Sequence, residues 1–354
     1  MAYDTERRVA VEAVLKACRL CQNVQDSLAG NEALGKQDGS PVTVADFGAQ
    51  AVICEHLQAA FPDDPIVGEE TTTLLRRDEN RALKEMVIRQ VKVISPDRNP
   101  VQILAAIDHA SARGGPQGRF WTVDPIDGTK GFLRRDQYAV ALALVENGIV
   151  VLGVLGCPNL PLKGLQSVGS LGCLLVAVRE EGAKIRRLDD CKETGIAVTK
   201  TSDSSRAVIC ESFETDHSSH EQAAQVARRL GIAHEPLRLD SQCKYAVVAR
   251  GDASIYLRLP KEEGYQEKIW DHAAGSLIVE EAGGRVTDVG GKTLDFSTGK
   301  KLLRNRGIIV SNGRLHAAFL AAVQAVRADG PGRIAMLSIF PKLGISCMLT
   351  SRLD

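Results

Sequence analysis

The sequence is poor in aromatic residues and carries no excess of charge of either sign. Phe, Trp and Tyr make up 4% of its 354 residues, and 44 Lys and Arg residues balance 44 Asp and Glu residues. A protein that binds nucleic acid regardless of base sequence needs a positive field for the phosphates and, on single strands, rings that stack on the bases. We therefore expect no nucleic-acid partner.

The sequence also lacks a long hydrophobic run. Its longest uncharged apolar stretch, residues 147–162, is interrupted by Gly148, Gly153, Gly156, Pro158 and Pro161. A membrane-spanning helix does not carry Gly and Pro at that density. The first residues, MAYDTERRVAVEA, hold three acids and no apolar core, so no secretory signal or transit peptide is visible. We expect a cytoplasmic, monomeric protein without a membrane partner.

Nine cysteines, an odd number, are scattered mostly through apolar runs. This pattern favours reduced thiols in a core over a disulfide framework. The pair Cys18 and Cys21 has the Cys-x-x-Cys spacing but no second pair, so we do not interpret it as a zinc or redox motif. Redox control through Cys157 and Cys173 stays a weaker hypothesis, because the sequence gives no distance between their sulfurs.

The pattern of hydrophobic residues changes at about residue 206, where strands begin to alternate with helices. Such alternation is typical of an α/β lobe, whereas the part before it indicates an α+β lobe. We therefore predict an α+β lobe over residues 1–205, an α/β lobe over 206–330 and a tail over 331–354.

Within the first lobe, helices are predicted over residues 6–28 and 44–60. The pair Asn147-Gly148 predicts a hairpin between two β-rich runs. Residues 71–100 are charged and poorly patterned, and we predict a surface insertion there.

The segment FWTVDPIDGTKGF, residues 120–132, places two acids three residues apart after an apolar run. Pro125 biases Asp124 toward an extended backbone, so we predict a tight turn that brings Asp124 and Asp127 onto one ion. Gly128 and Thr129 then open a predicted helix whose free N–H groups suit a phosphate. A solvated turn is the alternative. The DxDGT motif of haloacid-dehalogenase phosphatases has a different spacing and does not match.

Two further acidic sites favour a metal site over a turn. Glu69 and Glu70 follow a short apolar run that ends in Gly68, so a carboxylate projects from a strand end, although exposed loop glutamates would look the same. An apolar stripe beginning at Trp270 predicts a helix. Asp271, in its first turn, is either a ligand or a carboxylate that offsets the helix dipole.

Thr43 and Asp46 have the spacing of a helix capping box, and this structural role competes with a functional one for Asp46. A chemical role would be favoured if the Gly-Ser-Pro loop before it folded over a site.

The motifs GSPVTVAD, GEE, DPIDGT and WDHAAG occur in the order and approximate spacing of the lithium-sensitive inositol monophosphatase superfamily. Within it, the sequence is similar to the plant and fungal 3′(2′),5′-bisphosphate nucleotidases from about residue 1 to 327. The passages ESFETDHSSH, DSQCKYAVVARGDASIYLRLP and EKIWDHAAG, with the long run that begins at DPIDGTKGF, carry that narrower match. The segment Thr71-Thr72-Thr73 departs from it, since relatives commonly have another acid and a serine there.

The resemblance implies a two-lobed, layered αβαβα sandwich that binds Mg²⁺ between its lobes. The implied metal ligands are Glu69, Asp124, Asp127, Asp271 and the backbone carbonyl of Ile126. Asp46 and Thr129 would orient and deprotonate the attacking water, and Gly128 and Thr129 would contact the phosphate. The implied nucleotide pocket comprises His217, Ser241, Lys244, Arg258 and Asp271.

The activity implied by the resemblance is hydrolysis of the 3′-phosphate of adenosine 3′,5′-bisphosphate, and of 3′-phosphoadenosine 5′-phosphosulfate. Mg²⁺ prefers oxygen ligands, which matches a set of acids and a carbonyl without His or Cys. An inositol polyphosphate 1-phosphatase is the enzymatic alternative. A nucleotide sensor without turnover is the alternative from another class.

Overall fold

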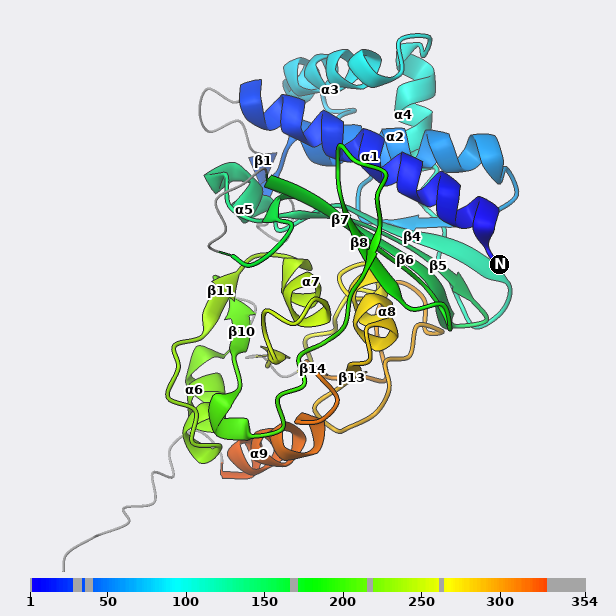
Figure 1. Cartoon of the computed structure of the whole chain (residues 1–354). Helices are drawn as coiled ribbons and strands as arrows, with labels where there is room; N and C mark the ends of the chain where they lie inside the picture. The colour runs from blue at the N-terminus through cyan, green and yellow to red at the C-terminus, as the bar shows by residue number, and fades with distance from the viewer. Residues whose placement is uncertain are drawn as a thin grey trace, which may run out of the picture.

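The computed structural model describes residues 2–27, 34–35, 41–165, 171–214, 219–260 and 264–329, with the backbone alone at 34–35 and 41–42. In this part of the chain, layers of helices alternate with two large sheets, from the top to the bottom of Figure 1. The predicted αβαβα sandwich is confirmed. The residues from 330 onward, which include the predicted tail, lie outside the described part.

The outer helical layer consists of α1 (Asp4–Ser27), α2 (Val44–Ala60), α3 (Arg81–Ile94) and α4 (Pro100–Asp108). It covers one face of a seven-stranded sheet (Figure 1). In spatial order this sheet holds β3 (Ile66–Gly68), β4 (Arg119–Asp127), β5 (Ala139–Glu146), β6 (Ile149–Pro161), β7 (Leu171–Val178), β8 (Ala183–Arg187) and β9 (Thr194–Gly195). β3 and β4 run parallel, and the other neighbours run antiparallel.

The middle layer holds α7 (Cys243–Ala249) and α8 (Ala273–Glu281). It packs between the first sheet and a five-stranded sheet in the order β11 (Leu237–Leu239), β10 (Ile209–Ser212), β12 (Ile255–Arg258), β14 (Ile308–Ser311) and β13 (Arg285–Thr287). The last layer is α6 (His220–Arg229) and α9 (His316–Asp329). The short elements are β1 (Leu34–Gly35), β2 (Pro41–Val42), α5 (Thr129–Arg134) and two 3₁₀ turns, η1 (Asp78–Asn80) and η2 (Ser204–Arg206).

The interior strand β5 is buried on both faces, and its side chains differ in size from one face to the other. Val140, Leu142 and Leu144 pack with the outer helices. The alternate positions, Ala139, Ala141 and Ala143, face the middle layer. Because these side chains are small, α8 can approach the sheet closely; a Cβ on the neighbouring Gly153 would lie 2.8 Å from the carbonyl oxygen of Ala274. This close contact positions the loop in front of α8.

The hairpin predicted at Asn147-Gly148 is confirmed, and both residues have positive φ, 49° and 78°, as a type I′ turn requires. The prediction of a surface insertion over 71–100 is wrong. Residues 81–94 form α3, which packs on α2 through the fully buried Val87 and Val91. Charged residues obscure the helical spacing of the buried valines in the sequence, and their side chains lie on the outer face of α3.

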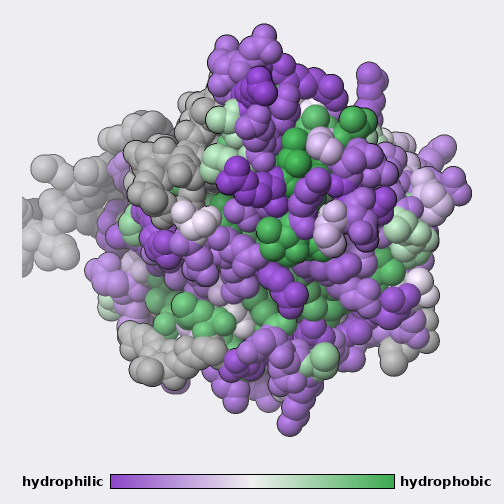
Figure 2. Space-filling model, turned by 90° about the horizontal axis from the view of Figure 1, so that it is seen from above, coloured by the Kyte–Doolittle hydropathy of each residue, from purple (hydrophilic) through white to green (hydrophobic). Residues whose placement is uncertain are grey.

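Figure 2 views the molecule from the side of the outer helices. Hydrophobic groups on this face are scattered among hydrophilic ones. Among the described residues, none of the helices combines the length and the apolar character needed to cross a membrane.

Candidate active site

Three of the predicted acids lie at the ends of neighbouring strands. Gly68, the last residue of β3, pairs with Val123 of β4, which places Glu69 beside Asp124. A Cβ on Gly68 would lie 2.7 Å from Oε1 of Gln50, so only glycine fits here. The side-chain amide of Gln50 donates to the Glu70 carbonyl at 2.7 Å and accepts from the Glu70 N–H at 2.9 Å. Gln50 thus holds the segment that carries Glu69 against α2.

Asp124 and Asp127 do not flank a tight turn, as predicted, but lie in one strand with a bulge between them. Asp124 pairs with Ala141 and Asp127 with Ala139, so three residues of β4 span two residues of β5. Without the bulge, the side chains would point to opposite faces, because strand side chains alternate. With it, both carboxylates share the sheet face of Ala139 and Ala141, which is the face toward α8.

The fourth acid, Asp271, lies in the loop before α8 rather than in its first turn. The helix begins at Ala273, not near Trp270 as predicted. The carbonyl of Trp270 accepts a hydrogen bond from Nε2 of Gln242 at 2.9 Å, so it does not enter the helical hydrogen-bond pattern. The stripe of apolar residues continues into this loop, which is why the sequence places the helix start too early.

The four carboxylates share one electrostatic environment. Burial raises the pKa of Asp124 well above its usual range, and the charges of Glu69, Asp127 and Asp271 raise it further. Burial likewise raises the pKa of Asp127 to about 6, although Lys244 and Arg258 act in the opposite direction. Burial also raises the pKa of Asp271 well above its usual range. Acids from three separate parts of the sequence therefore share one electrostatic environment.

This cluster fits a metal ion. Asp124 is 2% exposed, and its Oδ1 is buried without a hydrogen-bond partner among the described residues. Carboxylates that raise each other's pKa are stabilised by a cation between them. The donors are all oxygens, which suits a hard divalent cation. The acidic cluster can therefore hold a metal ion.

Thr129 connects the cluster with Asp46. Its hydroxyl lies 3.2 Å from Oδ1 of Asp46 and 3.3 Å from the carbonyl oxygen of Ile126. Oδ2 of Asp46 accepts hydrogen bonds from the Thr43 backbone N–H at 2.8 Å and the Thr43 hydroxyl at 2.6 Å. The capping box is thus present, and one oxygen of Asp46 makes it while the other faces Thr129. The structural and functional interpretations of Asp46 are compatible.

Gly128 allows Ser241 to approach this segment. Its φ is +86°, and a Cβ there would lie 2.9 Å from the Cβ of Ser241. Ser241 itself has a positive φ of 63°, which is uncommon for a residue with a side chain. Ser241 follows β11, so the predicted phosphate contact and the predicted nucleotide pocket lie side by side.

Lys244 and Arg258 bring positive charge to this side of the site. The ammonium of Lys244 donates to the Leu239 carbonyl at 3.3 Å and lies 5.3 Å from the ring centre of Tyr256. Burial lowers the pKa of Lys244, although Asp127 acts to raise it. Arg258 lies 3.7 Å from Asp271. His217, the remaining predicted pocket residue, lies outside the described residues.

The sequence reasoning missed Gln242, which connects the two halves of the site. Its backbone N–H donates to Oδ2 of Asp127 at 2.6 Å. Its side chain holds the Trp270 carbonyl and, at 3.0 Å, accepts from the N–H of Gly275. The signal was its place in DSQCKY, next to Ser241, but nothing local indicates its partners.

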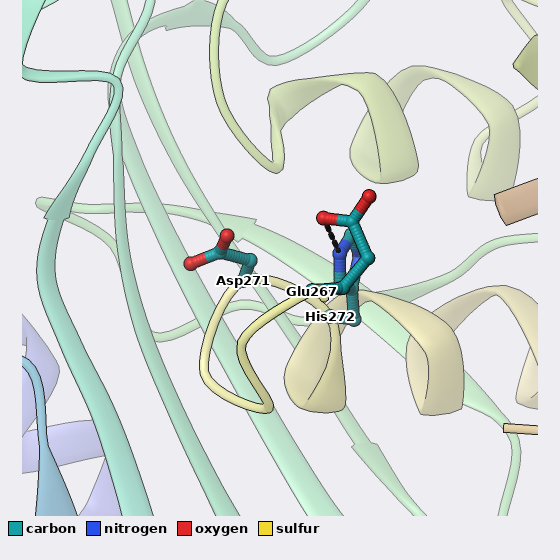
Figure 3. A group of neighbouring side chains, drawn as sticks. All are labelled: Glu267, Asp271 and His272. Atoms are coloured by element: carbon teal, nitrogen blue, oxygen red, sulfur yellow. Dashed lines mark hydrogen bonds and ion pairs between the residues drawn. The ribbon is translucent and has the colours of Figure 1, made fainter. Parts of the chain in front are cut away.

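Glu267 and His272 were missed as well. Together with Asp271 they bring possible metal-ligating atoms within 4.8 Å of one another. Figure 3 shows the Asp271 carboxylate set apart from the other two side chains, which a hydrogen bond joins. The only sequence signal is that Glu267 lies close to Asp271 along the chain.

The chain matches the model of the inositol monophosphatase family over residues 2–328. A protein of Emericella nidulans named 3′(2′),5′-bisphosphate nucleotidase is 43% identical, over 92% of this chain and 99% of its own. The Schizosaccharomyces pombe protein of that name is 42% identical, over 94% of this chain and 98% of its own. The Arabidopsis thaliana protein named 3′(2′),5′-bisphosphate nucleotidase 1 is 44% identical, over 92% of this chain and 97% of its own. The predicted likeness to the plant and fungal nucleotidases is confirmed.

Solved structures support the fold. The extragenic suppressor protein SuhB of Bartonella henselae superposes with a TM-score of 0.63 at 22% identity, over 91% of this chain and 99% of its own. An inositol monophosphatase from Anabaena superposes with a TM-score of 0.58 at 21% identity, over 92% and 97%. With a family match that spans nearly all described residues and a fold that agrees with it, the chain belongs to the inositol monophosphatase family.

Proposed function

We propose that the protein is a Mg²⁺-dependent 3′(2′),5′-bisphosphate nucleotidase. Its substrates would be adenosine 3′,5′-bisphosphate and 3′-phosphoadenosine 5′-phosphosulfate, and its products the 5′-nucleotide and phosphate. The observation that carries the proposal is the convergence of Glu69, Asp124, Asp127 and Asp271 beside the Thr129–Asp46 pair. The names of relatives above 40% identity support the nucleotide as substrate.

The proposed metal ligands are the four carboxylates and the carbonyl of Ile126. The negative charge of the phosphate and of the leaving oxygen is the main barrier to hydrolysis of a phosphate monoester. A bound Mg²⁺ would neutralise this charge. The proposal agrees with the raised pKa values, because the cluster is unfavourable without a cation.

The proposed base is Asp46, acting with Thr129. Asp46 is fully buried, and its Oδ2 is held by Thr43, so its Oδ1 has a defined position at the Thr129 hydroxyl. When this hydroxyl donates to Asp46, its lone pairs can accept a proton from water and fix the direction of attack. The Gly128 and Thr129 amides would hold the phosphate that leaves.

The proposed pocket for the part of the nucleotide beyond the cleaved phosphate comprises Ser241, Lys244, Arg258, Asp271 and His217. Lys244 and Arg258 would bind the phosphate that is not cleaved, because charge-assisted hydrogen bonds to phosphate are strong in a buried site. This pocket would lie between the proposed lobes, 1–205 and 206–330. We expect the protein to act in the cytoplasm on these small molecules.

The deciding experiment measures phosphate release from adenosine 3′,5′-bisphosphate and from inositol 1,4-bisphosphate in parallel, with and without Mg²⁺. The nucleotide should be hydrolysed with the higher kcat/KM, and chelation of Mg²⁺ should abolish turnover. A preference for the inositol phosphate would overturn the assigned substrate. Nucleotide binding with no phosphate release would favour the sensor alternative.

A further inference from the structure

Arg258 lies between two carboxylates. Its Nε is 2.8 Å from Oε2 of Glu267, and its Nη2 is 3.7 Å from Oδ2 of Asp271. Its side chain is 10% exposed, that of Glu267 2% and that of Asp271 19%. Coulomb attraction falls with distance and grows with burial, so Glu267 is the stronger partner. The guanidinium is therefore paired mainly with Glu267, although Asp271 is within reach.

Glu267 is itself held in place by His272. Its Oε2 lies 3.2 Å from Nε2 of His272, and Nδ1 of His272 lies 2.7 Å from the Tyr245 hydroxyl. A carboxylate only accepts hydrogen bonds, so Nε2 carries the proton and Nδ1 accepts from Tyr245. Both nitrogens of His272 are thus used. Burial acts to raise the pKa of Glu267, but Arg258 and His272 together lower it to about 2, so the carboxylate stays charged.

These contacts disfavour a metal ion held jointly by Glu267, Asp271 and His272. A ligating imidazole must offer an unprotonated nitrogen, and the one of His272 that faces Glu267 carries the proton. The positive charge that Glu267 requires is already supplied by Arg258 at 2.8 Å. Figure 3 agrees, since the Glu267–His272 pair lies apart from the Asp271 carboxylate.

We infer that Glu267 is a positioning residue that holds Arg258 away from Asp271, so that the Asp271 carboxylate stays open to a metal ion. Without the charge of Glu267, a buried guanidinium would be left uncompensated, which is strongly unfavourable. Asp271 is the next carboxylate within reach, and Arg258 would move onto it. The inference rests on the proposed function only in taking Asp271 as a metal ligand.

The test measures Mg²⁺ binding to the full-length protein by isothermal titration calorimetry. Glu267→Gln keeps the shape and can still accept from His272, but it removes the charge. We expect the Kd for Mg²⁺ to rise by about 10-fold or more, as for other residues that orient metal ligands. Glu267→Asp keeps the charge and should retain more of the affinity than Glu267→Gln.

The double variant Glu267→Gln/Arg258→Met separates this role from a merely structural one. It removes both buried charges, so no uncompensated cation remains to cover Asp271. We expect its Mg²⁺ affinity to return to within about threefold of the wild type, allowing for the imperfect additivity of neighbouring changes. If Glu267→Gln only disturbed the loop, the double variant would bind Mg²⁺ as weakly as the single one.

An unchanged Kd in Glu267→Gln, or a double variant without recovery, would overturn the inference. Should the single variant not fold, the double variant still decides, because weak Mg²⁺ binding by it contradicts the inference. The readout does not depend on turnover. A wild type that binds Mg²⁺ but releases no phosphate would contradict the proposed function and leave this inference standing.

Discussion

At the scale of single residues, Asp127 is a proposed metal ligand whose buried charge lowers the stability of the metal-free fold. Its Oδ2 accepts the Gln242 N–H at 2.6 Å, which favours the folded state. Burial and the charge of Glu69 oppose this contact and raise the pKa of Asp127 to about 6. The folded protein therefore binds a proton at this position more tightly than the unfolded chain does. At neutral pH and without a metal, the ionised carboxylate destabilises the fold.

We predict that Asp127→Asn melts at a higher temperature than the wild type when both are free of metal. The amide oxygen can still accept from Gln242, while one repelling charge is gone. Relief of roughly 1 kcal/mol would raise Tm by about 1–2 °C in a chain of this size. Activity should fall by roughly 100-fold or more if Asp127 is a metal ligand.

Thermal unfolding with and without Mg²⁺ checks this prediction. Mg²⁺ should raise the Tm of the wild type more than that of the variant, because ligands stabilise the state they bind. Asp63→Asn, at an exposed acid in a turn, is the matched control. It should change neither the Tm without metal nor the rise in Tm that Mg²⁺ causes. A variant that melts below the wild type in the absence of metal would show that the cluster is not strained by its charges.

At the scale of elements, α3 belongs to the core rather than to an appended loop. Val87 and Val91 are fully buried one turn apart, and the helix packs on α2, which carries Asp46 and Gln50. The connection from the Glu69 segment to α4 is thereby anchored. Thr72 contributes to this anchor, since its N–H and hydroxyl donate to Asp108 at 2.8 and 2.6 Å.

We predict that Val87→Ala lowers the free energy of unfolding by roughly 1–3 kcal/mol, because it removes two buried methyl groups and leaves a cavity. Val93→Ala is the same change on the same helix, at a side chain that is 62% exposed, and should have an effect below about 0.5 kcal/mol. Urea unfolding of both variants measures the difference. Equal stability of the two variants would contradict the packing of α3 on α2.

At the scale of the whole molecule, one buried histidine ties the last helix to the second sheet. His316, at the start of α9, lies 2.9 Å from the Thr287 hydroxyl of β13 and 2.8 Å from the Ser311 hydroxyl of β14. The Thr287 hydroxyl donates to the Asp288 carbonyl, so it accepts from Nε2 of His316, and Nδ1 is left as an acceptor for Ser311. Burial, with a smaller effect of Arg285, lowers the pKa of His316 to about 4.

We predict that this histidine makes the fold sensitive to acid. Its folded pKa lies below that of the unfolded chain, about 6.5. Between these values the unfolded state binds more protons, so stability falls as the pH falls, by at most about 1.4 kcal/mol for each pH unit. Above pH 7 the group is neutral in both states and contributes no pH dependence.

Urea unfolding of the wild type and of His316→Gln at several pH values isolates this contribution. Gln can also donate to one hydroxyl and accept from the other, but it does not titrate. The wild type should lose stability more steeply than the variant between pH 6.5 and 4. If the free energies of unfolding of the two proteins fell in parallel over that pH range, His316 would not be the source of the acid sensitivity.

Much of the fold and part of the site could be predicted from the sequence. The capping box at Asp46 and the turn at Asn147-Gly148 depend on neighbours a few residues away, and local patterns report such neighbours. The bulge between Asp124 and Asp127, where the sequence predicts a tight turn, depends instead on pairing with β5. Partial failures have the same explanation. The sequence places the start of α8 too early, because the apolar stripe continues into the loop that carries Asp271, where the Trp270 carbonyl bonds to distant Gln242.

What the sequence alone determined is the set of layers, the family likeness and the acids that the motifs contain. The tertiary structure decided which charges meet. It brought Gln242 to Asp127 across 115 residues, and it placed Glu267, rather than Asp271, nearest to Arg258. The physical reason is that secondary structure follows from local spacing. The pairing of buried charges instead depends on how separate strands and helices pack, and no spacing along the chain records that.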